Sequence, residues 1–222
     1  MIVSGLAPRW RKSLASLAVF AALAMATPVH AAKQIELTAD QSAAVDEVTA
    51  YIKDFRTLQG DFTQVSPRGT MSRGVFFLSK PGKMRFEYAD PNPLLIVSDG
   101  NWVTIKNRAK DRADQYPLSQ TPLRLVLSDG VDIRREANIL NVERTPEGLT
   151  AVTLEDRKKT IPGYLILVFD SERKALQQWI VVDGQGRRTT VSLENIEAGV
   201  KPDPKLFVVQ VNRSSDRKKL TR

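Results

Sequence analysis

The chain has 222 residues, a formal net charge of +8, a single histidine and no cysteine. The absence of cysteine excludes disulfides, thiol nucleophiles and Cys/His zinc sites. With 42% hydrophobic residues, the chain is long and apolar enough to bury a sizeable core without them.

The first 31 residues have the pattern of a secretory signal peptide. A basic stretch at residues 9–12 precedes an apolar run at residues 14–25, and the sequence VHAA at residues 29–32 offers the small side chains that a signal peptidase reads. The apolar run is shorter than the roughly 20 residues that a membrane-spanning helix needs. We therefore expect cleavage after Ala31 and export to a bacterial periplasm, rather than a membrane anchor.

Removal of residues 1–31 would also limit the chemistry of the protein. It takes away His30, the only histidine, and three basic residues, so that the formal charge falls to +5. Without histidine or cysteine, Ser-His-Asp triads and Cys nucleophiles are excluded. The remainder is predicted to form one domain over residues 32–211, followed by a basic tail at residues 212–222 with little apolar surface to bury.

The domain is predicted to begin with a helix. Apolar residues recur there at spacings of three, four and three, at Val45, Val48, Ile52 and Phe55. This spacing places them in one stripe. Thr38 and Gln41 fit a capping box at the start, and we expect the helix to end near residues 59–60.

After this helix the pattern changes to the alternation that is typical of strands. Strands are predicted at residues 62–66, 73–79, 83–88, 94–98, 102–106, 139–144, 149–155, 164–170, 175–182 and 188–196. The turn sequences KPGK, SDGN, TPEG, DSERK and DGQGR separate many of them. Such short connections favour antiparallel neighbours.

One segment interrupts the strands. Leu123, Val126 and Leu127 lie at helical spacing, with Thr121 as the expected cap and Pro122 at the first helical position. The sequence therefore predicts a mainly β protein with helices (α+β), in which one antiparallel sheet is long enough to curl and the helices cover its apolar face.

This pattern leaves several functions open. A curved sheet under helices either packs as an ordinary core, which is the usual state of protein interiors, or encloses a cavity for an apolar ligand. A carboxylate hydrolase built on acidic residues such as Asp99, Asp170 and Glu194 is a second alternative. Nucleic-acid binding is disfavoured, because basic and acidic residues are interspersed along the strands.

Several stretches together resemble one family. The sequences LQGDFTQVS, SKPGKMRFEY, LLIVSDGNWV, YPLSQTPLRLVL and IVVDGQGRRTTVSLENIEAG occur in this order along nearly the whole predicted domain. Their order and spacing are similar to those of the periplasmic outer-membrane lipoprotein carrier family, LolA. Each motif alone is unspecific, whereas the ordered set is fairly specific.

The resemblance implies an incomplete, strongly curved antiparallel barrel with a helical lid that encloses the acyl chains of a lipoprotein. It also implies an inner-membrane ABC-type releasing complex and an outer-membrane receptor as partners, with acylated lipoproteins as cargo. The family is not enzymatic and needs no cofactor or metal. We expect a monomer that does not bind nucleic acid.

The resemblance and the strand alternation together nominate site residues. The expected cavity lining is Phe77, Met84, Phe86, Tyr88, Trp102, Ile166, Val168, Trp179, Val191 and Leu193. The expected lid residues are Val48, Ile52, Phe55, Leu123, Val126 and Leu127. For each of them, a packed core residue remains the alternative reading.

The chain also departs from the family pattern. Lys80 occupies the position of an arginine that helps to hold the lid in the family, so it is the expected lid latch, without the planar fork of arginine. Met84 stands where phenylalanine is usual, and the segment VTIKNRAKDRADQYPL diverges. These departures leave a second hypothesis open: a carrier or sensor of another lipid, such as a glycolipid, or a module that reads lipoprotein state.

Overall fold

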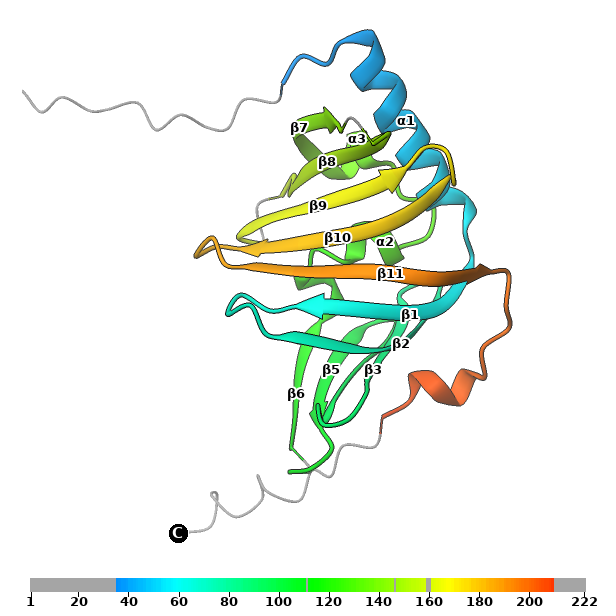
Figure 1. Cartoon of the computed structure of the whole chain (residues 1–222), viewed down its shortest axis with the longest axis vertical. Helices are drawn as coiled ribbons and strands as arrows, with labels where there is room; N and C mark the ends of the chain where they lie inside the picture. Colours follow the sequence, from blue (N-terminus) through cyan, green and yellow to red (C-terminus); the bar gives the residue numbers. More distant parts are fainter. Residues whose placement is uncertain (1–34, 111, 146, 159–160, 210–222) are drawn as a thin grey trace, which may run out of the picture. The chain divides into compact units, whose positions relative to one another are not determined.

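A computed structural model describes residues 35–110, 112–145, 147–158 and 161–209. The expected signal peptide and basic tail lie outside these ranges. The described residues form one sheet of eleven antiparallel strands (Figure 1). The strands are β1 (Thr57–Val65), β2 (Met71–Ser79), β3 (Lys83–Tyr88), β4 (Leu94–Asp99), β5 (Trp102–Asn107), β6 (Arg112–Pro117), β7 (Ala137–Arg144), β8 (Leu149–Asp156), β9 (Gly163–Asp170), β10 (Ala175–Asp183) and β11 (Arg188–Ala198).

The sheet consists of two meanders. It runs β6-β5-β4-β3-β2-β1-β11-β10-β9-β8-β7, so β1 to β6 form one meander, β7 to β11 form the other, and the pairing of β1 with β11 joins them. Strands β6 and β7 are the two edges and do not pair with each other, so the sheet remains open. The connection from β6 to β7 therefore has to cross from one edge of the sheet to the other.

The first helix, α1 (Ala39–Asp54), begins as predicted. The Thr38 side chain accepts a hydrogen bond from the Gln41 backbone N–H at 3.3 Å, and the Gln41 side chain accepts one from the Thr38 N–H at 3.0 Å. The helix ends earlier than residues 59–60, because Phe55 is already extended and the chain from Thr57 onward pairs with both β2 and β11. Strand pairing thus overrides the helical spacing that continues to Phe55.

The segment between β6 and β7 contains three short helices: η1 (Leu118–Gln120), α2 (Arg124–Leu127) and α3 (Ile133–Glu136). The expected cap at Thr121 and the expected first position at Pro122 were wrong: the Thr121 hydroxyl donates to the Leu118 carbonyl, and α2 begins at Arg124, two residues later, without a side-chain cap. Helix α3 was not predicted, although Asp132 caps it by accepting from the Arg134 N–H at 3.0 Å.

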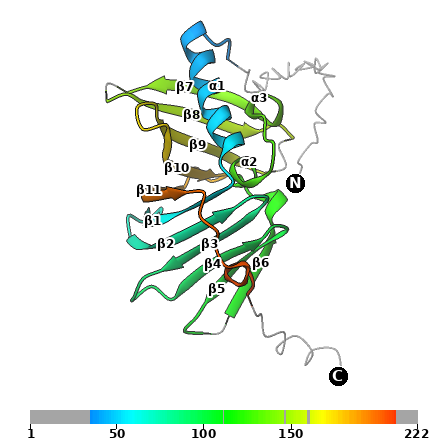
Figure 2. The ribbon, with the colours of Figure 1, turned by 90° about the vertical axis from the view of Figure 1, so that its right-hand side faces the viewer.

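Helices α1 and α2 and the main core lie on the concave face of the sheet. Figure 2 shows α1 across the half of the sheet that contains β7 to β10, with α2 near its C-terminal end. Buried apolar side chains from the strands, α1 and α2 form one continuous cluster, which we call the inner cluster. A second, small cluster of Leu95, Val97 and Phe207 lies on the outer face, where the 3-10 helix η2 (Pro204–Phe207) covers β3 and β4.

Among the helices of the described residues, none combines the length and apolarity needed to cross a lipid bilayer.

Candidate functional site

The centre of the inner cluster is a group of interlocking aromatic rings from four strands. Phe62 contacts Phe86 and Tyr88 edge-to-face, with ring centroids 4.9 Å and 5.0 Å apart. Phe86 also stacks on Phe76 and meets Trp179, at centroid distances of 5.8 Å and 5.6 Å. Such rings contribute more buried area than any aliphatic side chain. The concave face is therefore a broad aromatic and aliphatic surface.

Tyr88 adds a hydroxyl to this group, and that hydroxyl is hydrogen-bonded. Its hydroxyl donates to the Gln64 side-chain oxygen at 2.8 Å. Burial of the ring raises the pKa of Tyr88 to about 12, although the hydrogen bond to Gln64 opposes this shift. The tyrosine is therefore neutral at physiological pH, and the interior keeps its apolar character.

Helix α1 covers one half of the concave face. Val48 and Ile52 are fully buried against the inner cluster, and Phe55 follows at the end of the helix. Tyr51, one turn before, meets the rings of Phe55 and Phe169 at centroid distances of 5.7 Å and 5.3 Å. Helix α1 thus acts as a cover whose apolar stripe faces the sheet.

Helix α2 provides the second cover. Leu125, Val126 and Leu127 are buried in the inner cluster, and Leu123 packs partly against it. The polar side of α2 is anchored by Arg124, whose guanidinium pairs with the buried carboxylate of Asp156 and, at 3.1 Å, with Glu136 of α3. The pair with Asp156 fixes α2 to the end of β8.

The turn between β2 and β3 touches the ends of both helices. The Lys80 ammonium donates to the Ile52 carbonyl and lies 3.9 Å from the centroid of the Phe55 ring. Burial lowers the pKa of Lys80 to about 8; Asp129 raises it and Arg56 lowers it further. The Gly82 N–H donates to the Leu127 carbonyl at 2.8 Å. One turn therefore holds α1 through a side chain and α2 through the backbone.

The structure distributes the ten expected lining residues over both faces of the sheet. Six belong to the inner cluster: Met84, Phe86, Tyr88, Trp179, Val191 and Leu193. The six expected lid residues contact the same cluster. The alternation from Lys83 to Tyr88 thus has its apolar side on the concave face, while Arg85 on the other side donates to the Leu206 carbonyl of η2.

The other four lining predictions are corrected. Phe77 packs into the small outer cluster, and Trp102 is 48% exposed on the outer face. Ile166 and Val168 also point outward, because their neighbours in β9 occupy the inner cluster. In these strands apolar residues occupy both faces of the sheet. The sequence pattern therefore cannot show which of two adjacent apolar residues faces the interior.

Sequence reasoning missed six other residues of the inner cluster. They are Phe62, Phe76, Leu165, Leu167, Phe169 and Leu125. The sequence YLILVF at residues 164–169 offers no alternation that could assign them to a face. For Phe62 the neighbouring residues contain a usable signal. The polar residues Gln59, Asp61 and Thr63 mark the outer side of β1, so Phe62 between them is expected on the inner side.

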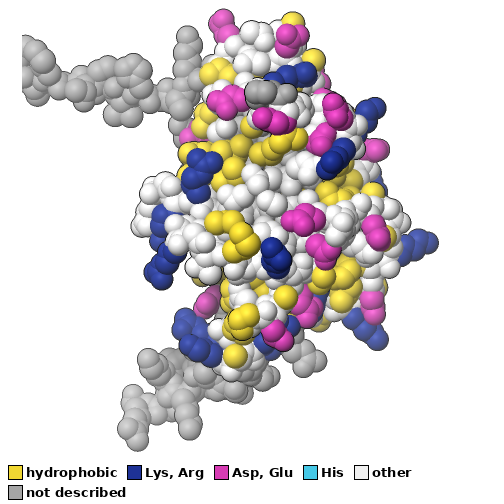
Figure 3. All heavy atoms as spheres, in the orientation of Figure 1, with side chains coloured by type: hydrophobic (Ala, Val, Ile, Leu, Met, Phe, Trp, Pro, Cys, Tyr) yellow, Lys and Arg dark blue, Asp and Glu magenta, His cyan; other side chains and the backbone are white. Residues whose placement is uncertain are grey.

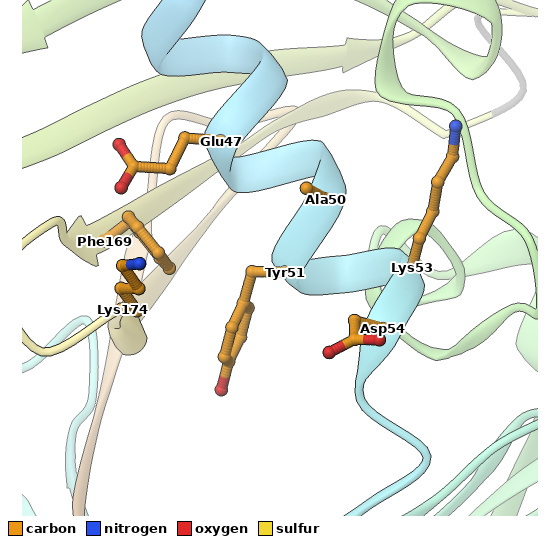
Figure 4. Close-up of a pocket in the computed structure, with 7 residues that line it drawn as sticks. All are labelled: Glu47, Ala50, Tyr51, Lys53, Asp54, Phe169 and Lys174. Atoms are coloured by element: carbon orange, nitrogen blue, oxygen red, sulfur yellow. The ribbon is translucent and has the colours of Figure 1, made fainter.

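Two further features bear on the surface. A hollow of about 610 Å³ lies between α1 and the β9–β10 hairpin; Figure 4 shows Tyr51 and Asp54 on the helix side and Phe169 and Lys174 opposite. Seen from the side on which β10, β11 and β1 lie in front of α2, apolar side chains form patches that charged residues interrupt (Figure 3). Some apolar side chains are therefore exposed on the outside of the molecule.

The three acidic residues of the hydrolase alternative make local hydrogen bonds. Asp99 accepts from the backbone N–H groups of Asn101 and Trp102, both at 2.8 Å, and Asp170 accepts from two N–H groups of the next turn. Glu194 accepts from the Thr63 hydroxyl at 3.2 Å. Each of these carboxylates thus serves a local turn or strand contact. Within the described ranges, no three His, Asp or Glu side chains are grouped to hold a metal ion.

Comparison with known proteins gives consistent results. Residues 53–210 match the model of the family described as outer membrane lipoprotein carrier protein LolA. A protein of Methylococcus capsulatus named outer-membrane lipoprotein carrier protein is 30% identical over 168 residues, which cover 71% of this chain and 79% of the relative. A protein of the same name from Chromohalobacter salexigens is 27% identical over 207 residues, covering 90% and 94%.

The chain is also similar to solved structures. A LolA superfamily protein from Nitrosomonas europaea covers 76% of this chain and 97% of its own, with a TM-score of 0.44 and 9% sequence identity. A putative outer membrane lipoprotein-sorting protein domain from Vibrio parahaemolyticus covers 74% and 94%, with a TM-score of 0.47 and 6% identity.

Proposed function

The chain belongs to the LolA family of outer membrane lipoprotein carrier proteins, and we propose that it is a periplasmic, non-enzymatic carrier that shields the acyl chains of lipoproteins between its sheet and its helices. One observation carries this proposal: the concave face of an open sheet is mainly apolar, and two separate helices cover it. The sequence of residues 1–31 supports export to the periplasm.

The energetics explain why such a carrier needs a cover. Each methylene that leaves water contributes about 0.8 kcal/mol, so a multiply acylated protein would not cross an aqueous compartment unaided. The side chains of α1 and α2 occupy the same apolar surface that acyl chains would use. Cargo therefore competes with the helices, and loading requires that they move away from the sheet.

The contacts that hold the helices fit this competition. On its apolar side α1 contributes Val48 and Ile52, whereas Lys80 holds its end by one hydrogen bond and one cation–π contact. The first turn of α1 is held as well, because Arg134 of α3 donates to the carbonyl and the hydroxyl of Ser42. Opening breaks these contacts and leaves the strand pairing intact. The apolar area that α1 and α2 lose on opening is replaced by acyl chains, so the loaded and empty states can be close in free energy.

We infer the direction of transport from membership of the family. We propose that an inner-membrane ABC-type complex loads the protein and that an outer-membrane receptor unloads it. Acylated lipoproteins are the cargo, and nucleic acid is not a partner. The carrier performs no covalent step on its cargo.

A release experiment tests the proposal. The purified mature protein is incubated with energised spheroplasts, and the supernatant is separated by size and analysed by mass spectrometry. We expect lipoproteins in soluble one-to-one complexes with the carrier. A folded protein that releases no lipoprotein, beside a working carrier in parallel, would contradict the proposal. Lipid extraction from the same sample then decides whether the bound species is another lipid, such as a glycolipid.

A further inference from the structure

The sheet contains a local separation of two neighbouring strands. The pairing of β10 with β11 ends at Gln178 and Ser192. Beyond this point β11 continues to Ala198 along β1, while β10 follows β9 as far as Ala175. Figure 1 shows the two strands diverging toward the side on which α1 ends. We call this place the β10–β11 gap; residues 175–177 and 193–196 form its two sides.

Irregularities on both sides hold the gap open. The pairing of β10 with β9 shifts register between Leu176 and Gln178, and the pairing of β1 with β11 shifts between Gln59 and Asp61. Such bulges bend a strand and increase its twist. Next to the second shift, Asn195 has a left-handed backbone with φ 51°. Because each strand bends with its other neighbour, the separation is built into the sheet.

Gly60 is part of this arrangement. A Cβ atom at residue 60 would lie 2.5 Å from the carbonyl oxygen of Glu194 and 2.8 Å from that of Asn195. Both oxygens belong to the backbone of β11, so the contact cannot be relieved by a side-chain rotation. Glycine at this position allows the irregular stretch of β11 to lie close to β1, away from β10.

The gap forms a hollow that is lined by both polar and apolar side chains. It measures about 480 Å³, and Arg173, Gln177 and Glu194 are among the residues that line it. Leu193, also in its wall, belongs to the inner cluster, and Ile196 packs partly against that cluster. The wall of the gap therefore contains both polar side chains and side chains that pack in the apolar interior.

We propose that the β10–β11 gap is the docking site for the extended polypeptide that follows the acylated end of the cargo; this inference rests on the proposed carrier function. Acyl chains inside the sheet are covalently attached to a peptide, and that peptide has to leave the interior somewhere. Leu193 and Ile196 face the acyl side, while the amide and charged groups of Gln177 and Glu194 suit a polar chain.

The chemistry of the gap fits a peptide better than an additional lipid tail. Where two strands separate, their backbone N–H and C=O groups no longer pair with each other, and an extended peptide can satisfy such groups by strand addition. The backbone of Leu176 already bonds to the Tyr51 hydroxyl, so the peptide would pair with its neighbours and with β11. Recognition through the backbone depends little on side chains. A carrier that transports many different lipoproteins needs this kind of contact after the common lipid anchor.

The first test changes only the backbone of the cargo. A tripalmitoylated cysteinyl peptide is titrated into the unmodified mature protein, in parallel with a lipopeptide of the same sequence whose peptide nitrogens are methylated. We expect the methylated probe to bind about tenfold more weakly, the effect of losing one or two ordinary hydrogen bonds. Equal affinities would overturn the inference and leave acyl binding intact. If neither probe binds, the carrier function itself fails, and the inference with it.

The second test locates the peptide. The photoreactive residue p-benzoylphenylalanine replaces Gln177 in the gap or, as the matched control, Arg188 in the paired part of β11. Circular dichroism checks that both variants fold. After irradiation with the lipopeptide, mass spectrometry should find a cross-link from position 177 to the peptide portion and far less from position 188. A cross-link from position 177 to the acyl chains alone, or equal yields at both positions, would overturn the inference.

Discussion

The Lys80 ammonium donates a hydrogen bond to the Ile52 carbonyl in the last turn of α1 and also lies over the ring of Phe55. Carbonyl groups at the end of a helix have no partner within the helix, so this lysine satisfies one of them. Two residues later, the Gly82 N–H binds the carbonyl of Leu127 at the end of α2. Both covers of the apolar face are therefore attached to one short turn.

Replacement of Lys80 should change how long the cover stays closed. We expect Lys80→Met to free the end of α1, because the hydrogen bond and the cation–π contact that hold it are lost. The amides at the end of α1 should then exchange faster with deuterium. Lys80→Arg should have the opposite effect and slow the release of a bound lipopeptide, since its fork can reach more than one acceptor.

The matched control is Lys83→Met, at the start of β3 on the other side of the same turn. Hydrogen exchange measured by mass spectrometry and release kinetics of a fluorescent lipopeptide give the two readouts. A Lys80 variant that behaves like the Lys83 variant in both would show that the lysine does not act as a latch.

The same lysine should make stability depend on pH. Its pKa is lowered from 10.5 to about 8, with burial as the main cause. Between these values the unfolded chain binds the proton and the folded protein does not, so the free energy of unfolding rises with pH in this window. Below pH 8 both states are protonated, and the cost of burying the charge is fully present.

Arginine provides the control for this pH dependence, because it keeps its proton throughout the window. Urea denaturation of the wild type and of Lys80→Arg at several pH values between 7 and 10.5 measures the difference. We expect the wild type to gain stability relative to the variant as pH rises. Parallel curves for the two proteins would contradict a depressed pKa at Lys80.

Much of the sheet could be predicted from the sequence, because its turns carry glycine, proline and aspartate between alternating segments. The strand from Lys83 to Tyr88 has the predicted bounds. The strand from Arg112 to Pro117 was missed, since RADQYP at the edge of the sheet has no buried position and therefore no buried face to impose alternation. A strand of this kind is specified by its neighbour rather than by its own pattern.

The site was predictable only where one face of a strand is polar. Met84 and Phe86 lie between charged residues, so their side of β3 was evident. Ile166 and Leu167 are both aliphatic, and the sequence gives no reason to prefer either. The latch at Lys80 came from the resemblance to a family, because its partner, the carbonyl of Ile52, is a backbone group that no side-chain pattern reveals.

The adjacent pair Ile166 and Leu167 tests this assignment of faces directly. Leu167 is completely buried in the inner cluster, whereas Ile166 lies on the outer face. We expect Leu167→Ala to lower the free energy of unfolding by about 2–5 kcal/mol, and Ile166→Ala to lower it by less than about 1 kcal/mol. Urea denaturation measures both. Equal losses, or a larger loss at residue 166, would reverse the assignment for β9.

The buried ion pair of Arg124 and Asp156 should be essential for the position of α2. The side chain of Asp156 is only 3% exposed and that of Arg124 17%, so removal of the aspartate leaves a guanidinium poorly solvated. We expect Asp156→Ala to lower the free energy of unfolding by about 3 kcal/mol or more. The double variant Arg124→Met, Asp156→Leu should recover much of this loss, because no unpaired charge remains in the interior.

A surface pair supplies the comparison for this prediction. Arg112 and Asp114 lie 3.6 Å apart with side chains 76% and 50% exposed, and Asp114→Ala should cost less than about 1 kcal/mol. Urea denaturation of all variants gives the free energies, and hydrogen exchange reports on α2 itself. In Asp156→Ala the amides of α2 should lose protection before those of the sheet. If the buried and the surface variants lost the same small amount, the pair would not position α2, and the hold on this cover would have to come from Gly82 and the apolar contacts alone.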